Sequence, residues 1–197
     1  MKHYSFGSLI FFLLSLSWPL GVCLGADDPL RLASLDSSSA RQPENNQWTT
    51  LNPAELKLRS TSALVVDQSG QIVYEKKADQ ARPIASITKL MTAMVILDSG
   101  LPLQQKITIT KEDRDLLQLT GSRLKYGATL PRQQLVRLAL MASENRAANA
   151  LGRTYPGGHA AIVKSMNRKA RELGMSNSTV ADPAGLDAGN IAPARDV

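Results

Sequence analysis

The stretch that decides the fold runs from residue 84 to residue 97 and reads IASITKLMTAMVIL. Apolar side chains recur on every face of this segment, which predicts a helix buried at the centre of a domain. Ser86 and Lys89 are three residues apart near its start, so their side chains lie side by side in a helix. Burial of the Lys89 amine favours its neutral form and lowers its pKa. A neutral amine beside a hydroxyl is a general base beside a nucleophile, which predicts a catalytic pair.

A structural alternative explains the same two residues, because Ser86 is also a good helix cap and Lys89 can extend to water. Spacing alone does not decide, since Ser and Lys are frequent enough for Ser-x-x-Lys to arise by chance. A second example occurs at Ser122 and Lys125. Glycines and alternating residues around it predict a turn and a short strand, in which the two side chains need not share a face.

Residues 1–25 are expected to form a secretory signal peptide. They combine a positive start at Lys2, a short apolar core at residues 8–20 and a small residue near position 25. The core is too short for a comfortable membrane span of about 20 residues. Lipid attachment at Cys23 is a minor alternative, because Val22 is larger than such sites usually tolerate. We therefore expect an exported, periplasmic protein.

Removal of this segment narrows the chemistry that the mature chain can carry. It takes away the only cysteine and leaves His159 as the only histidine, so neither a disulfide nor a thiolate metal site is expected. A Ser-His-Asp triad would need His159, which we expect instead to be a solvated residue in the first turn of a helix. We predict no cofactor and no metal site.

The chain carries a formal net charge of +6. Such a balance suits peripheral association with a cell wall or a membrane surface. Blocks of Lys and Arg interleaved with aromatic residues are not found, so nucleic acid is not expected as a partner.

The pattern along the chain predicts one domain behind a tether. Residues 26–58 are polar and read as a flexible linker, and residues 59–197 are expected to hold the domain. The elements predicted in it are a hairpin of residues 62–67 and 71–75, a strand at 106–110, a helix from Thr129 or Leu130 with Leu135, Leu138, Ala139 and Met141 inward, an Ala-rich helix at 144–151, an amphipathic helix at 159–173 with Ile162, Met166, Ala170 and Leu173 on one face, a loop at 181–186, and a helix that begins at Pro193.

A second motif, Ser143-Glu144-Asn145, lies between two predicted helices. Taken alone, Ser143 is best explained as the cap of the following helix. Joined to Ser86-x-x-Lys89 in an exported protein, it is far more specific, because Ser-x-x-Lys followed by Ser-x-Asn is typical of the penicillin-recognising serine enzymes.

On these motifs, and on residues 84–93, 142–148 and 155–158, the chain resembles the low-molecular-mass penicillin-binding proteins, a family of D-alanyl-D-alanine endopeptidases and carboxypeptidases. The last two segments look most like the endopeptidase branch. The resemblance implies an α+β fold of the β-lactamase and transpeptidase type, with an antiparallel sheet packed with helices and a helical subregion. It also implies peptidoglycan peptide cross-links as substrates and β-lactams as covalent inhibitors.

The resemblance further implies roles for four residues. Ser86 would be the nucleophile, and its backbone amide would form half of an oxyanion hole. Lys89 would accept the proton of Ser86, and Ser143 would relay a proton toward the leaving amine. Asn145 would bind substrate and steady Lys89.

One departure from the family is expected to matter. A Lys-Thr-Gly motif on a sheet strand normally follows Ser-x-Asn, and residues 146–197 contain none. We therefore expect a C-terminally truncated chain that lacks the last strands and is inactive by itself. Two alternatives stay open: a serine β-lactamase, although its Glu-x-x-Leu-Asn pattern is not found after Asn145, and a non-catalytic peptidoglycan-binding protein.

Overall fold

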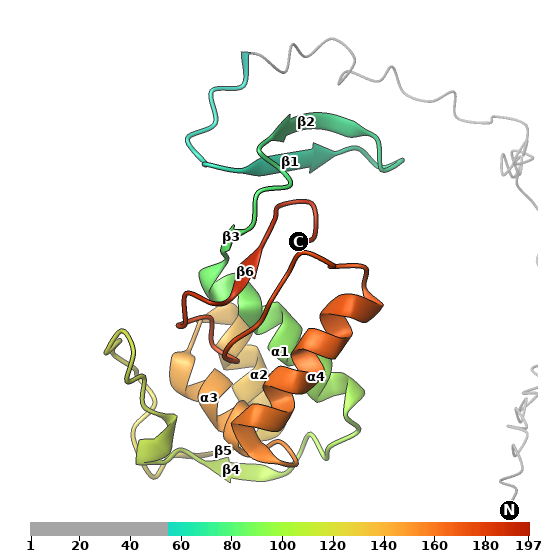
Figure 1. Cartoon of the computed structure of the whole chain (residues 1–197). Helices are drawn as coiled ribbons and strands as arrows, with labels where there is room; N and C mark the ends of the chain where they lie inside the picture. The colour runs from blue at the N-terminus through green and yellow to red at the C-terminus, as the bar shows by residue number, and fades with distance from the viewer. Residues whose placement is uncertain (1–54) are drawn as a thin grey trace, which may run out of the picture. The chain divides into compact units, whose positions relative to one another are not determined.

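A computed structural model of the chain describes residues 55–197. The predicted signal peptide and all but the end of the predicted linker lie outside these residues. In chain order, the elements are β1 (Ala63–Val66), β2 (Ile72–Lys76), β3 (Arg82–Pro83), the 3-10 turn η3 (Ala85–Ile87), α1 (Thr88–Asp98), β4 (Lys106–Thr108), the 3-10 turn η4 (Lys111–Asp113), β5 (Thr129–Pro131), α2 (Arg132–Met141), α3 (Asn145–Arg153), α4 (Gly158–Glu172) and β6 (Ile191–Ala192) (Figure 1).

The strands form three small antiparallel sheets, each of two strands. β1 pairs with β2 as the predicted hairpin, and Gly70 provides the positive φ of +83° that its turn requires. β4 pairs with β5. β3 pairs with β6 from the far end of the chain, which brings residue 192 opposite residue 82.

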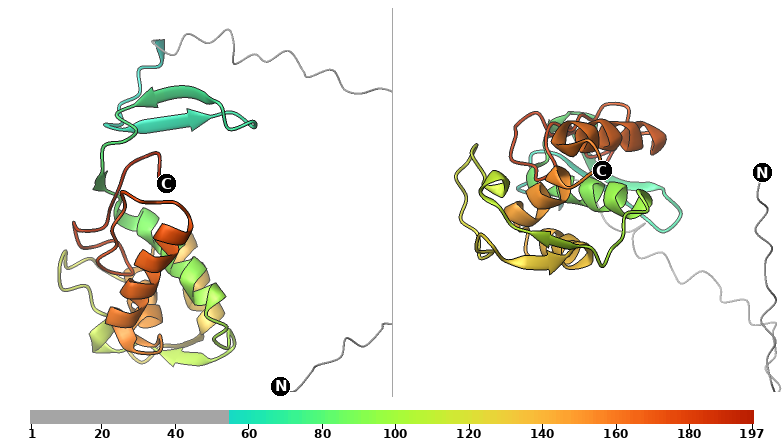
Figure 2. Two further views of the ribbon diagram at one scale, coloured as in Figure 1. Left: turned by 45° about the vertical axis from the view of Figure 1, so that its right-hand side comes forward. Right: turned by 90° about the horizontal axis from the view of Figure 1, so that it is seen from below.

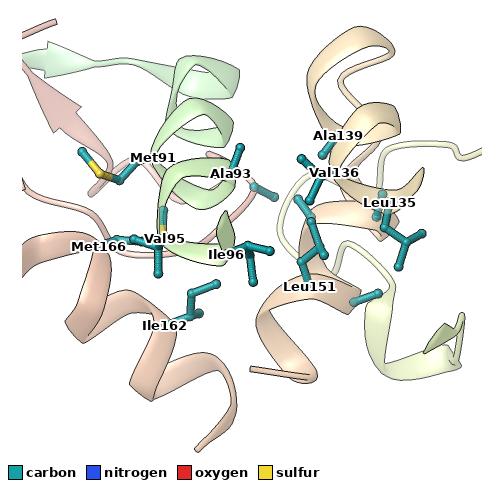
Figure 3. Close-up of a cluster of buried hydrophobic side chains, with 14 of the residues drawn as sticks. Met91, Ala93, Val95, Ile96, Leu135, Val136, Ala139, Leu151, Ile162 and Met166 are labelled. Atoms are coloured by element: carbon teal, nitrogen blue, oxygen red, sulfur yellow. The ribbon is translucent and has the colours of Figure 1, made fainter. Parts of the chain in front are cut away.

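The core lies between four helices, because α1 packs against α2, α3 and α4. Figure 2 shows this grouping from two further directions. Side chains from all four helices meet in one cluster, which includes Ile96, Leu135, Leu151 and Ile162 (Figure 3). Alanines line the inner face of α3 and permit close helix contacts. This packing holds α1, and with it the Ser-x-x-Lys segment, in a rigid frame.

The prediction that the central helix is buried on every face is wrong. Met91, Val95 and Ile96 are buried, but Leu90 and Leu97 are each 55% exposed. The helix also begins later than expected, because residues 85–87 form a 3-10 turn. The apolar residues on every side of this segment therefore predicted the helix correctly, but they could not distinguish its buried face from its exposed face.

Four further expectations are corrected by the structure. Residues 129–131 are a strand paired with β4 rather than the start of α2, and Met141 at the end of α2 is 87% exposed. Leu173 lies just past α4 and is also exposed. Pro193 opens a turn instead of a helix, because residues 191–192 are held as a strand by β3. Short segments of this kind take their structure from distant partners that local patterns do not reveal.

The hairpin, the Ala-rich helix and the 158–172 helix are confirmed, apart from shifts of one or two residues at their ends. Within residues 55–197, every helix is too short or too polar to span a bilayer.

Candidate active site

Ser86 lies in the 3-10 turn that leads into α1. The residue before it, Ala85, has a φ of +45°, which is unusual for a residue with a side chain. Backbone strain of this kind persists only where surrounding contacts enforce it, and it is frequent at functional sites. Ser86 is exposed at the surface.

Lys89 reaches Ser86 from the first turn of α1, as the spacing predicts. Its Nζ lies 2.9 Å from the Ser86 Oγ and donates at 2.7 Å to the carbonyl oxygen of Ala184. Lys89 is only 2% exposed, so it does not extend to water as the structural alternative required. Burial lowers the pKa of Lys89 below that of an ordinary lysine, while the charges of Asp182 and Glu144 oppose this shift. Desolvation is the largest of these effects, so the pKa of Lys89 is lowered overall.

Ser143 approaches the same hydroxyl from the loop between α2 and α3. Its Oγ donates to the Ser86 Oγ at 2.7 Å, and its φ of +51° turns the backbone to make this approach. The explanation of Ser143 as a helix cap is wrong, because Glu144 occupies the cap position and its own carboxylate accepts from the Arg146 N–H. Ser86 therefore receives hydrogen bonds from an amine on one side and a hydroxyl on the other.

Asn145, the fourth predicted site residue, is the first residue of α3. Its Nδ2 donates at 2.8 Å to the hydroxyl of Thr120. Its Oδ1 is buried and has no hydrogen-bond partner among the described residues. No hydrogen bond joins Asn145 to Lys89 among the described residues, and Asn145 instead donates to a loop that the sequence did not mark as part of the site.

The contact between Lys89 and Ala184 depends on a loop at residues 182–190. The carboxylate of Asp182 accepts from the backbone N–H groups of residues 184–187 at 2.6–3.0 Å. The fully buried side chain of Asn190 donates to the same carboxylate at 2.6 Å. Charge-assisted hydrogen bonds of this kind are the strong ones in proteins. These hydrogen bonds fix the carbonyl of Ala184 in the position from which it accepts the hydrogen bond of the Lys89 amine.

Two contacts attach this loop to the start of α1. The buried hydroxyl of Thr92 donates at 2.7 Å to the carbonyl oxygen of Pro183, and the Ile84 N–H donates to the carbonyl oxygen of Asn190. The residue pattern of 181–186 predicted only a turn-rich loop. The Asp182-Pro183 pair ahead of Gly185 was a signal for a tight turn, but nothing local tied it to Lys89.

The other candidates of the sequence lie outside this constellation. Ser122 forms a turn in which its Oγ accepts from the Leu124 N–H at 3.0 Å, which agrees with the expected turn. His159 is an exposed residue in the first turn of α4, as predicted. Among residues 55–197, no group of three or more His, Cys, Asp or Glu side chains has the geometry of a metal site.

Comparison with known proteins places this geometry in a family. Residues 47–197, well over half of the chain, match the family model described as D-alanyl-D-alanine carboxypeptidase. The chain belongs to this family. The resemblance inferred from the two motifs is thus confirmed.

Two curated relatives are D-alanyl-D-alanine endopeptidases. The protein from Pseudomonas aeruginosa is 47% identical over 146 residues, which cover 74% of this chain and 47% of the relative. The protein from Escherichia coli is 43% identical over 150 residues, which cover 76% of this chain and 48% of the relative. The chain therefore spans about half the length of the curated relatives that it matches.

Solved structures of the family share the fold. A D-alanyl-D-alanine carboxypeptidase from Francisella tularensis superposes with a TM-score of 0.62 at 32% identity, over 74% of this chain and 37% of the other. A penicillin-binding protein from Listeria monocytogenes, solved with bound cefotaxime, gives a TM-score of 0.62 at 32% identity, over 72% of this chain and 60% of the other. The predicted α+β, transpeptidase-like fold is confirmed.

Proposed function

We propose that the whole protein is a serine-type D-alanyl-D-alanine peptidase that forms an acyl-enzyme on Ser86. The observation that carries the proposal is the position of one hydroxyl, that of Ser86, between the Lys89 amine at 2.9 Å and the Ser143 hydroxyl at 2.7 Å. A nucleophile within hydrogen-bond reach of a base, with the base oriented by a further group, is the arrangement that covalent catalysis requires. Ala184 is the orienting group for Lys89.

Acylation begins with the neutral form of Lys89. In the structure the Lys89 Nζ donates to the Ser86 Oγ, whereas the neutral amine has two N–H bonds and one lone pair. It can keep its bond to the Ala184 carbonyl and turn the lone pair toward Ser86 to accept the hydroxyl proton. The Ser86 oxygen then bonds to the D-alanyl carbonyl carbon, and the carbon–nitrogen bond of the substrate breaks. Ser143 gives its proton to the departing amine and takes in exchange the proton that Lys89 accepted, so both side chains return to their starting forms. Water later hydrolyses the ester. In this scheme Asn145 contacts the substrate beside the reacting bond.

We assign the peptide cross-links of peptidoglycan as the substrate, with endopeptidase cleavage ahead of carboxypeptidase cleavage. Support comes from the two curated endopeptidases at 47% and 43% identity. The apparent signal peptide at residues 1–25 supports export to the periplasm, and the net charge of +6 supports peripheral contact with an anionic wall or membrane. β-Lactams are expected to acylate Ser86, since they present a reactive amide to the same nucleophile.

Covalent labelling with a fluorescent penicillin tests the nucleophile in the whole protein. The wild type is expected to retain the dye through denaturation, and Ser86→Ala is expected to abolish labelling. Ser122→Ala is the matched control, because it removes the serine of the other Ser-x-x-Lys spacing and leaves Ser86 intact. Unlabelled wild type, or equal labelling of the Ser86→Ala variant, would overturn the proposal.

Digestion of purified muropeptides tests the substrate. Conversion of cross-linked dimers to monomers supports an endopeptidase, whereas release of terminal D-alanine alone supports a carboxypeptidase. An acyl-enzyme that persists for minutes or longer fits a peptidase, and rapid turnover of penicillin would favour a β-lactamase. Wall binding without any cleavage, retained in the Ser86→Ala variant, would favour a non-catalytic binding protein.

We also propose that the 197-residue chain by itself does not turn over substrate. Its residues 146–197 hold no Lys-Thr-Gly motif, the motif that in this family supplies a carboxylate anchor and a second oxyanion amide. The same penicillin label, applied to the purified 197-residue chain, tests this point. Stoichiometric labelling would contradict it.

A further inference from the structure

The loop that contacts Asn145 is organised by a buried carboxylate. Asp115 is 3% exposed and accepts from the backbone N–H groups of Leu117, Gln118 and Thr120 at 2.8–3.0 Å. These hydrogen bonds outweigh desolvation and lower the pKa of Asp115 to about 2. The carboxylate is therefore ionised at any physiological pH and can only accept hydrogen bonds.

The charge of Asp115 decides which way the hydroxyl of Thr120 points. The Thr120 Oγ1 lies 2.7 Å from the Asp115 Oδ2, and an ionised carboxylate has no proton to give. The single hydroxyl proton of Thr120 must therefore lie on this bond. The lone pairs of Thr120 remain, so toward its other neighbour the hydroxyl acts as an acceptor.

That other neighbour is the side-chain amide of Asn145, at 2.8 Å. An acceptor on Thr120 selects the amide nitrogen of Asn145, since only the nitrogen carries protons. The orientation of the amide follows from this chemistry, although nitrogen and oxygen have nearly the same shape. With Nδ2 held by Thr120, the Oδ1 is directed to the opposite side, where it is buried and has no partner among the described residues.

We propose that Thr120 and Asp115 are positioning residues that hold the Asn145 amide in one orientation, so that its buried, unpartnered oxygen is kept available as a hydrogen-bond acceptor. The inference rests on the proposed function, because it assigns a task within that site. Neither residue touches the reacting atoms. A flipped amide would place a donor where the site has an acceptor, and binding of a substrate N–H there would be lost.

Contacts on both sides of Thr120 keep the loop in place. Leu119 has a φ of +55°, which the hydrogen bonds to Asp115 enforce. Gln118 donates through Nε2 to the carbonyl oxygen of Leu186 at 2.8 Å. The loop that orients Asn145 is thereby joined to the loop that orients Lys89. The two predicted site residues thus share one connected support.

A pair of variants at position 120 tests the proposal in the whole protein. Thr120→Val keeps the shape of the side chain but removes the acceptor, and it is expected to slow acylation by penicillin about tenfold. Thr120→Ser restores the hydroxyl and is expected to recover most of the rate. Thr129→Val is the matched control, since it removes a hydroxyl bonded only at the β4–β5 sheet. Equal rates for the Val and Ser variants at position 120 would overturn the proposal.

A second measurement observes the side-chain amide of Asn145 directly and does not depend on enzymatic activity. In protein labelled with ¹⁵N-asparagine, the Asn145 side-chain protons are expected to exchange with water more slowly than those of the exposed Asn177. Asn167, whose Nδ2 donates to the carbonyl oxygens of Val163 and Val180, is the protected reference. Exchange of Asn145 as fast as that of Asn177 in the wild type would overturn the inference, even if Thr120→Val does not fold. Wild type that is never labelled by penicillin would instead count against the proposed function.

Discussion

Gly185 packs directly against the backbone of Ala85, so that a Cβ atom on Gly185 would lie 1.9 Å from the Ala85 carbonyl oxygen. Gly185 also has a φ of +78°, in the region that favours glycine. The loop at residues 182–190 therefore packs against the residue before Ser86, and only the absence of a side chain at position 185 lets it approach.

We expect Gly185→Ala to separate this loop from α1. The substitution should lower the free energy of unfolding by clearly more than the roughly 1–2 kcal/mol that a left-handed backbone alone costs a residue with a side chain. Penicillin acylation should fall with it, because Ala184 no longer holds Lys89. Gly70→Ala is the control, since Gly70 has a φ of +83° but open space around its Cβ position. Urea unfolding measures both variants, and equal losses would contradict the close contact.

Acylation should depend on pH through Lys89. Burial lowers the pKa of Lys89, and only the neutral amine can accept the Ser86 proton. The acylation rate is therefore expected to rise with pH through this lowered pKa and to reach a plateau below pH 10.5. Lys89→Arg should be inactive over the same range, because arginine stays protonated. A flat profile for the wild type from pH 5 to pH 10 would count against Lys89 as the base.

The same pKa shift fixes the sign of a stability effect. Between the lowered pKa of folded Lys89 and the ordinary value near 10.5, the unfolded chain binds more protons than the folded chain. Stability contributed by this group therefore rises with pH across that window. Lys89→Met, which removes the titrating amine, should lose this rise in denaturant titrations at several pH values.

Asp182 is expected to act on Lys89 in two ways. Asp182→Asn leaves one oxygen where two accept the N–H groups of residues 184–187, and we expect a loss of about 2 kcal/mol in unfolding free energy. It also removes a charge that raises the pKa of Lys89, so the midpoint of the acylation profile should move to lower pH. Asp187→Asn is the control in the same loop, with one local bond to Gly189. An unchanged midpoint would show that Asp182 acts on the loop alone.

The two faces of α1 should differ sharply in their tolerance of truncation. Ile96→Ala removes a side chain that is 0% exposed and should cost about 2–5 kcal/mol through lost burial and a cavity. Leu97→Ala, at the next position and 55% exposed, should cost less than about 1 kcal/mol. Thermal or denaturant unfolding of the two variants makes the comparison, and similar losses would mean that the outer face is covered in the protein.

Much of the site could be predicted because its key spacing is local. Residues three apart meet in any helical turn, so the contact between Ser86 and Lys89 followed from the sequence. The family followed from adding Ser143 and Asn145, since the two motifs together are much more specific than either alone. The hairpin and the amphipathic helix at residues 158–172 were likewise visible in periodicity.

The local sequence pattern could not predict contacts between residues that are far apart in the chain. The Ala184 carbonyl lies 95 residues from the amine that it holds, and Thr120 lies 25 residues from Asn145. β6 forms only because β3 is beside it. The outer face of α1 is as apolar in sequence as the inner face, so composition could not separate them.

The amino-acid sequence by itself determined the contact between Ser86 and Lys89 and the family, because short-range geometry and a specific pair of motifs carry that information. Only the tertiary structure decided which distant residues hold Lys89 and Asn145 in place. The Asp182 and Asp115 carboxylates each accept several backbone N–H groups of one loop. One loop contacts Lys89 through the Ala184 carbonyl, and the other contacts Asn145 through Thr120. Hydrogen bonds between distant segments depend on the packing of α1 to α4, and this packing exists only in the folded chain.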